Sequence, residues 1–148
     1  MTPRWVVRAT FGMSLGALAI ATYLTIAHYT SPKALACVEG GIVNCTKVTT
    51  SSWSSFIGVP VAVLGVVWSA AMVWLCRPAA WRSRKSWVNV VRVIGSCVGI
   101  LSVLYLVYAE LIALHAICLW CTGMHLLVFG LFVLIVLHPA PERVPTHR

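Results

Sequence analysis

The sequence predicts an all-α membrane protein built as a bundle of four transmembrane helices. Composition is the first indication, because 60% of the 148 residues are apolar and 9% are charged, against roughly 45–50% and about 25% in soluble domains. Four long apolar runs and an uneven distribution of Lys and Arg are the other two. The net charge of +8 does not indicate nucleic-acid binding, since the basic residues form no continuous stripe that could follow a phosphate backbone.

Each apolar run approaches the roughly 20 residues that a helix needs to cross about 30 Å of hydrocarbon. The runs predict helices at about 9–29, 56–76, 88–109 and 115–137 within one domain of residues 1–148. Ala34-Leu35-Ala36-Cys37 resembles a lipoprotein cleavage site. However, polar residues separate that site from the first run, which is also long for a signal sequence, so we expect a retained helix.

The largest predicted loop, residues 31–55, carries Cys37 and Cys45. The segment at about 48–56 suits a short interfacial helix, because Trp53 and Phe56 favour the membrane interface while the neighbouring hydroxyl groups face water. We expect this loop to hold a cysteine pair against the membrane surface.

Positive charges give the expected orientation. With the basic connector at 77–87 on the cytoplasmic side, only Lys33 and Lys47 lie outside. The nine inside are Arg4, Arg8, Arg77, Arg82, Arg84, Lys85, Arg92, Arg143 and Arg148. Because cytoplasmic segments carry an excess of Lys and Arg, we expect a multi-pass protein of the inner (plasma) membrane. Both termini are then cytoplasmic, and the large loop faces the periplasm or extracytoplasmic space.

This orientation divides the six cysteines into two groups. Cys76 lies at the cytoplasmic end of the second predicted helix and Cys97 lies within the third, where cysteine is typically a small buried packing residue. The other four are expected at the outer face, where disulfides persist if the compartment is a periplasm. They are Cys37, Cys45, Cys118 and Cys121.

The pair Cys118 and Cys121 has the C-x-x-C spacing of a redox-active site. Both residues are expected in the first turns of the last helix, where the positive end of the helix dipole favours a thiolate. A purely structural bridge is the alternative, but a loop this short removes little entropy from the unfolded chain. We therefore expect a disulfide that opens and closes.

Cys37 and Cys45 lie in a loop that also contains Gly40 and Gly41. A flexible loop would let their disulfide break and swing toward the last helix, as thiol exchange requires. The alternative is a static loop staple. Two pairs on one membrane face suggest a relay between a dithiol in the aqueous compartment and an acceptor in the bilayer.

A metal site is the competing interpretation of His115, Cys118, Cys121 and His125, which share one face of the predicted helix. Zinc accepts such ligands, but four of them along one straight helix lie too far apart to close a tetrahedron. Covalent haem requires histidine where Thr122 stands. We therefore predict no metal.

His125 is expected inside the membrane, where a histidine is costly and by default a functional candidate. It could donate a hydrogen bond to a carbonyl oxygen of a bound molecule or supply protons. The alternative is a structural hydrogen bond to a neighbouring helix. His28 and His115 are expected to be solvated at helix ends, and Trp120 to be an interfacial anchor that packs on the cysteines.

The order of these features resembles the vitamin K epoxide reductase family, specifically its bacterial homologues. The resemblance covers nearly the whole chain. It is carried by Cys37-x7-Cys45, Ser51, Gly58-Val59-Pro60 at the start of the second helix, and Ile117-Cys118-Leu119-Trp120-Cys121-x3-His125 in the last.

The resemblance implies an enzyme that reoxidises a DsbA-like thioredoxin-fold protein and passes two electrons to a membrane quinone, which could be menaquinone, ubiquinone or a vitamin K type. Cys37 would meet the partner dithiol, Cys45 would exchange with Cys118, and Cys121 would face the quinone. Ser51 matches a hydroxyl position near the active site, and His125 matches a quinone-pocket position. We expect no fused thioredoxin domain, so the partner would be a separate protein.

Other functions remain as alternatives. One is a quinone or vitamin K epoxide reductase with a different thiol donor. Another is a non-enzymatic membrane subunit whose cysteines are staples. A third is a DsbB-type quinone reductase, but there the C-x-x-C precedes the spaced pair, whereas here the order is reversed.

Overall fold

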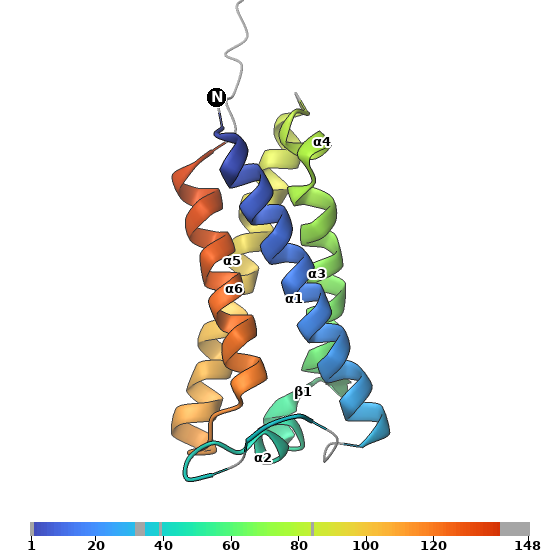
Figure 1. Ribbon diagram of the computed structural model, residues 1–148, viewed down its shortest axis with the longest axis vertical. Helices are drawn as coiled ribbons and strands as arrows, with labels where there is room; N and C mark the ends of the chain where they lie inside the picture. Colours follow the sequence, from blue (N-terminus) through green and yellow to red (C-terminus); the bar gives the residue numbers. More distant parts are fainter. Residues whose placement is uncertain (1, 32–34, 39, 84, 140–148) are drawn as a thin grey trace, which may run out of the picture.

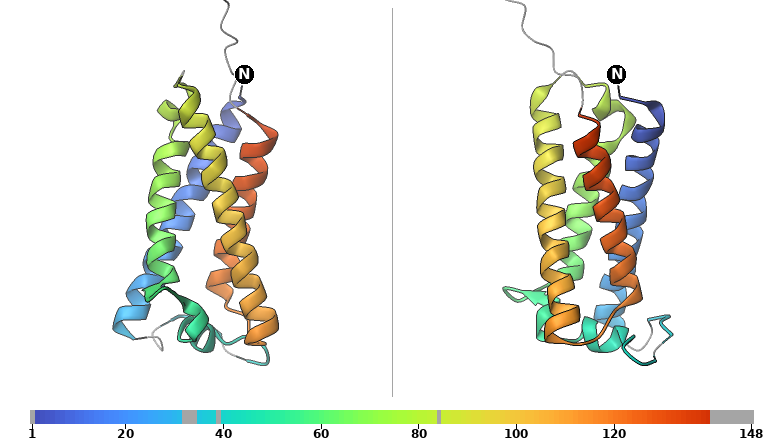
Figure 2. Two further views of the ribbon diagram at one scale, coloured as in Figure 1. Left: turned by 180° about the vertical axis from the view of Figure 1, so that it is seen from behind. Right: turned by 90° about the vertical axis from the view of Figure 1, so that its left-hand side faces the viewer.

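The computed structural model describes residues 2–31, 35–38, 40–83 and 85–139. Four helices pack side by side along one axis (Figure 1), and views from two further sides show the same bundle (Figure 2). They are α1 (Arg4–Thr30), α3 (Val61–Cys76), α5 (Ser86–Tyr108) and α6 (Leu119–Leu137). The predicted all-α membrane fold is confirmed by these helices.

Three of the described helical segments are long and apolar enough to cross a membrane: α1, α6, and α5 with its continuation to Ala113. The continuation, η3 (Ala109–Ala113), is π-helical. Helix α3 is apolar but has 16 residues, a length of about 24 Å. It is therefore the shortest of the four members of the bundle.

Short elements close the two ends of the bundle. The chain start and α4 (Pro78–Trp81), in the basic connector, lie at one end, while α2 and β1 lie at the other (Figure 1). The second end is built from α2 (Cys45–Thr49), the 3-10 helix η2 (Ser52–Ser54), and the strands β1 (Ser55–Phe56) and β2 (Val59–Pro60). The loop cysteines and most of the described basic residues are thus at opposite ends.

The helix boundaries differ from the predicted ones. The first helix begins at Arg4 rather than 9, and the third begins at Ser86 and ends at Tyr108 before the π turn. The prediction that the second helix starts at 56 is wrong, because β1 and β2 pair as an antiparallel hairpin. Its turn contains Ile57 at φ 52° and Gly58 at φ 79°, which are not helical conformations.

The predicted start of the last helix at 115 is also wrong. His115 has a left-handed backbone at φ 50°, and Ile117 forms a β-bridge with Val43. Helix α6 therefore begins at Leu119. Tertiary pairing overrides the apolar pattern over these residues.

Arg92, counted above among the cytoplasmic charges, is buried at the end of the bundle that holds α4. Its Nε and Nη2 donate to the carbonyl of Leu75 at 3.0 and 2.9 Å, and its guanidinium lies 3.8 Å from the ring centre of Trp81. These contacts satisfy a carbonyl in the last turn of α3. Arg92 therefore joins α3, α4 and α5.

Candidate active site

A backbone pairing brings the two cysteine pairs together. The N–H of Asn44 donates to the carbonyl of Ile117 at 3.0 Å, and the N–H of Ile117 donates to Ile42 at 2.9 Å. The bridge between Val43 and Ile117 is parallel, so the chain continues in the same direction from both segments. One segment then reaches Cys45 and the other reaches Cys118, and both cysteines lie fully buried in one hydrophobic cluster.

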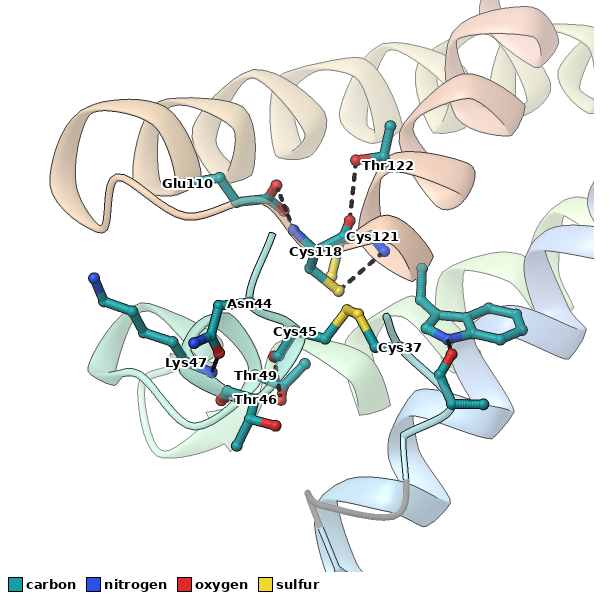
Figure 3. The surroundings of a disulfide bond; sticks show 12 residues. Cys37, Asn44, Cys45, Thr46, Lys47, Thr49, Glu110, Cys118, Cys121 and Thr122 are labelled. Atoms are coloured by element: carbon teal, nitrogen blue, oxygen red, sulfur yellow. Dashed lines mark hydrogen bonds between the residues drawn. A yellow bond between two sulfur atoms is a disulfide. The ribbon is translucent and has the colours of Figure 1, made fainter. Parts of the chain in front are cut away.

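Cys37 and Cys45 form a disulfide, whereas Cys118 and Cys121 are free thiols. The side chain of Cys118 points toward this disulfide (Figure 3). Gly40 and Val43 exchange two backbone hydrogen bonds of 3.0 Å, so the glycine pair forms a tight turn. The expected swing of the loop is therefore not needed for contact, because the disulfide already lies beside Cys118.

Trp120 holds the segment that carries Cys37. Its indole N–H donates to the carbonyl of Ala36 at 3.0 Å, and the N–H of Ala36 donates to the hydroxyl of Tyr23 at 2.9 Å. The ring centres of Tyr23 and Trp120 lie 4.7 Å apart. Trp120 packs on the site as predicted and in addition fixes the residue directly before Cys37.

Cys118 is the N-cap of α6. Its sulfur accepts the N–H of Cys121 at 3.3 Å, and its carbonyl accepts the N–H and hydroxyl of Thr122 at 2.9 and 3.0 Å. The pKa of the Cys118 thiol is lowered, chiefly by the hydrogen bond with the Cys121 side chain and further by backbone N–H groups; burial and Glu110 oppose this shift. A thiolate at this position is a nucleophile directed at the disulfide.

The lowered pKa predicts that Cys118 remains a thiolate at a lower pH than an ordinary cysteine. The alkylation rate of the Cys118 peptide, followed by mass spectrometry across pH, should therefore begin to fall at a lower pH than that of a free cysteine peptide in the same solution. Cys121→Ala removes the largest cause of the shift and should move the Cys118 profile to higher pH. Identical profiles in the two proteins would show that Cys121 does not set this pKa.

A cavity of about 590 Å³ lies between the helices next to Cys121. This volume is within the range of roughly 300–1,000 Å³ typical of small-molecule sites. Its wall is mostly apolar and aromatic, with Trp53, Trp68 and Tyr105 among the lining residues. The structure brings the three predicted cofactor-binding residues, Ser51, Cys121 and His125, to this one wall.

Two of these residues have polar groups available to a ligand. Within the described part of the chain, the His125 ring makes no hydrogen bond, which disfavours the structural alternative for this residue. The Ser51 hydroxyl donates to the carbonyl of Val48 at 2.8 Å, and its oxygen can still accept. An apolar cavity with a few polar groups suits a ring that has carbonyl oxygens and an apolar tail.

The sequence model of the vitamin K epoxide reductase family matches residues 8–136. The match runs from the second turn of α1 to the last turn of α6. The chain belongs to the vitamin K epoxide reductase family. Members of this family are membrane oxidoreductases that act as disulfide oxidoreductases or quinone reductases, and they use quinones in general. The cavity and the cysteine pairs fit both components of that chemistry.

The four residues weighed above as alternative metal ligands do not share one helix face. His115 precedes α6 in a left-handed conformation and is exposed, so it does not share a helix face with His125. Among the described residues, no three His, Cys, Asp or Glu side chains are grouped to hold a metal ion.

Glu110 is the residue of this site that sequence reasoning missed. It is 5% exposed, lines the cavity, and accepts the N–H of Cys118 on Oε2 at 3.4 Å. The available signal was an acidic residue within an apolar run, which is costly in a membrane and commonly functional. His28, expected to be only solvated, also lines the cavity.

Proposed function

We propose that this family member reoxidises a separate DsbA-like thioredoxin-fold protein and passes two electrons through its two cysteine pairs to a membrane quinone. One observation carries the proposal. The Cys37–Cys45 disulfide, Cys118 and Cys121 pack in one hydrophobic cluster, and Cys121 also lines the cavity. The positive charges favour an orientation with both termini cytoplasmic and the cysteines on the outer side.

The outer pair accepts electrons from the partner. Cys37 is half-buried while Cys45 is fully buried, so a partner thiolate reaches the Cys37 sulfur first. The attack forms a mixed disulfide and releases Cys45 as a thiolate. The second partner thiol then closes the partner's disulfide and leaves Cys37 reduced, so two electrons have entered the chain.

The inner exchange requires Cys118 and Cys121 to be joined as a disulfide. The Cys45 thiolate attacks Cys118 and releases Cys121. Cys37 then attacks Cys45, restores the Cys37–Cys45 disulfide and releases Cys118. Because the Cys118 pKa is lowered, Cys118 is a favourable leaving group in this second step.

The cavity residues fit a quinone, with His125 and Ser51 as polar contacts and Cys121 at the wall. When bound, a quinone supplies an acceptor for two electrons and two protons. Cys118 and Cys121 provide both as their S–S bond forms. Menaquinone, ubiquinone and vitamin K all have the two carbonyl oxygens that these contacts require.

Reconstitution in lipid vesicles tests the proposal. Purified protein supplied with a reduced DsbA-like protein and either menaquinone or ubiquinone should form partner disulfide and quinol in a one-to-one ratio. Quinol formed only with a small dithiol would favour a reductase with a different thiol donor. A stapled subunit would form neither product, although loss of its cysteines would lower its abundance.

A further inference from the structure

Glu110 is the only acidic residue in the described part of the chain, and it lies in a membrane-spanning segment. Its side chain is 5% exposed, and no Lys, Arg or His side chain in the described part of the chain forms an ion pair with it. Burying a carboxyl group in this way is costly, and within membranes it usually marks a group that handles ions, protons or substrate. Packing alone does not explain it.

The backbone places this carboxyl group. Residues Ala109–Ala113 form a π turn, in which the N–H of Leu114 donates to Ala109 and the N–H of Ala116 donates to Glu110, at 2.9 and 3.0 Å. Single π turns occur frequently at functional sites because they change the direction of side chains. Here the Glu110 side chain points toward the backbone of Cys118 (Figure 3).

Glu110 has one oxygen in use and one available. Oε2 accepts the N–H of Cys118 at 3.4 Å, and Oε1 makes no hydrogen bond with the described residues. The residue also shares the cavity wall with Cys121 and His125. It therefore lies between the cysteines that lose protons and the space where an acceptor would gain them.

The relay must also move protons from the cysteine thiols to the quinone. Oxidising the Cys118 and Cys121 thiols to a disulfide releases two electrons and two protons, the Cys118 proton leaving first where that thiol is ionised, and reduction of a quinone to a quinol consumes two electrons and two protons. The cavity wall is mostly apolar, so it gives the protons few polar groups to follow. A side chain that both accepts and donates a proton is needed there.

We propose that Glu110 carries protons from the Cys118 and Cys121 thiols to the acceptor in the cavity. The carboxylate takes a thiol proton as the S–S bond forms and gives it to an oxygen of the bound quinone, so the residue ends each transfer as it began. This inference rests on the proposed function, because it requires oxidation of this pair by a quinone.

Other ionisable groups near the site belong to several elements. They are His28 of α1, Lys47 of α2, Tyr105 and Tyr108 of α5, and Cys121 and His125 of α6. Lys47 already has a hydrogen-bond partner, because its Nζ donates to the carbonyl of Leu114 at 2.7 Å. Glu110 is distinguished by its direct bond to Cys118 together with its place on the cavity wall.

A purely structural role is the competing explanation, in which Glu110 only accepts the Cys118 N–H. Glu110→Gln separates the two roles, because glutamine keeps an acceptor oxygen of the same size and position but does not ionise. Glu110→Asp keeps an ionisable carboxyl group on a shorter chain. Thr122→Val is the matched control for geometry, since it removes a different hydrogen bond to Cys118.

The measurement is the single-turnover rate at which ubiquinone or menaquinone oxidises the Cys118–Cys121 dithiol in vesicles, as a function of pH. We expect E110Q to bind quinone like the wild type but to react about 10²-fold more slowly, a typical contribution of general acid–base catalysis. The rate of E110Q should also no longer depend on pH over the range in which the Glu110 carboxyl group ionises in the wild type. E110D should recover most of the rate, and Thr122→Val should change it far less than E110Q.

The outcomes separate the two proposals. If the wild-type dithiol is not oxidised by quinone, the proposed function fails and the role of Glu110 fails with it. If the wild type reacts and E110Q keeps its rate and pH profile, the proposed function stands and the role of Glu110 is overturned. If E110Q does not accumulate in membranes, E110D and Glu110→Asn decide, because the two side chains match in length and differ in ionisation; equal rates and pH profiles in these two variants would again overturn the role.

Discussion

Cys121→Ser should lower quinol formation by roughly 10³-fold or more, because the Cys118–Cys121 disulfide cannot form without its second sulfur. Quinol formation in vesicles, with a reduced DsbA-like protein as donor, measures this loss. Cys97→Ser is the control, since Cys97 lies outside the site and is expected to behave as a packing residue. Turnover at the wild-type rate in Cys121→Ser would show that the relay is wrong.

The same variant tests the order of the relay. In Cys121→Ser the Cys118 thiolate still lies beside the disulfide, and its attack on Cys45 should yield a Cys45–Cys118 mixed disulfide and release the Cys37 thiolate, which can reverse the step. In the Cys37→Ala/Cys121→Ser double variant, Cys45 and Cys118 are both thiols with no competing partner in the site, so an added two-electron thiol oxidant such as diamide should join them as a stable Cys45–Cys118 disulfide. Peptide mapping under non-reducing conditions identifies it. A bond from Cys118 to any other cysteine would contradict the assigned order.

The sequence predicted that both cysteine pairs belong to one face because helix length and charge distribution set which segments share a side of the membrane. It could not predict their contact. That contact depends on the pairing of Val43 with Ile117, which joins segments far apart in the chain and leaves no local pattern. The same pairing makes α6 begin at Leu119, whereas the apolar run alone indicates a helix that begins at 115.

The cavity residues also differ in whether the sequence could predict them. His125 was predicted from the cost of placing histidine in a membrane, and Ser51 from the family resemblance alone; the structure places both on the cavity wall. Glu110 carries the same kind of signal as His125. Its role became visible only when the π turn placed its carboxyl group beside Cys118, since a helical pattern does not show where such a turn occurs.

His125→Leu should weaken quinone binding by about 5- to 150-fold, the effect of leaving a buried carbonyl oxygen without its donor at about 1–3 kcal/mol. His125→Gln retains N–H groups and should lose less. The KM for quinone and the kcat, measured with a saturating thiol donor, test this. Leu126→Ala is the control, because Leu126 is the next residue on α6 but is 67% exposed.

The two kinetic parameters distinguish holding the quinone from moving protons. A residue that binds substrate and transition state equally raises KM when it is removed, whereas one that acts only in the transition state lowers kcat. His125→Leu should therefore act mainly on KM and Glu110→Gln mainly on kcat. If His125→Leu instead lowers kcat with KM unchanged, His125 transfers protons rather than holding the ring, and Glu110 would then share that task with a second group on the same wall.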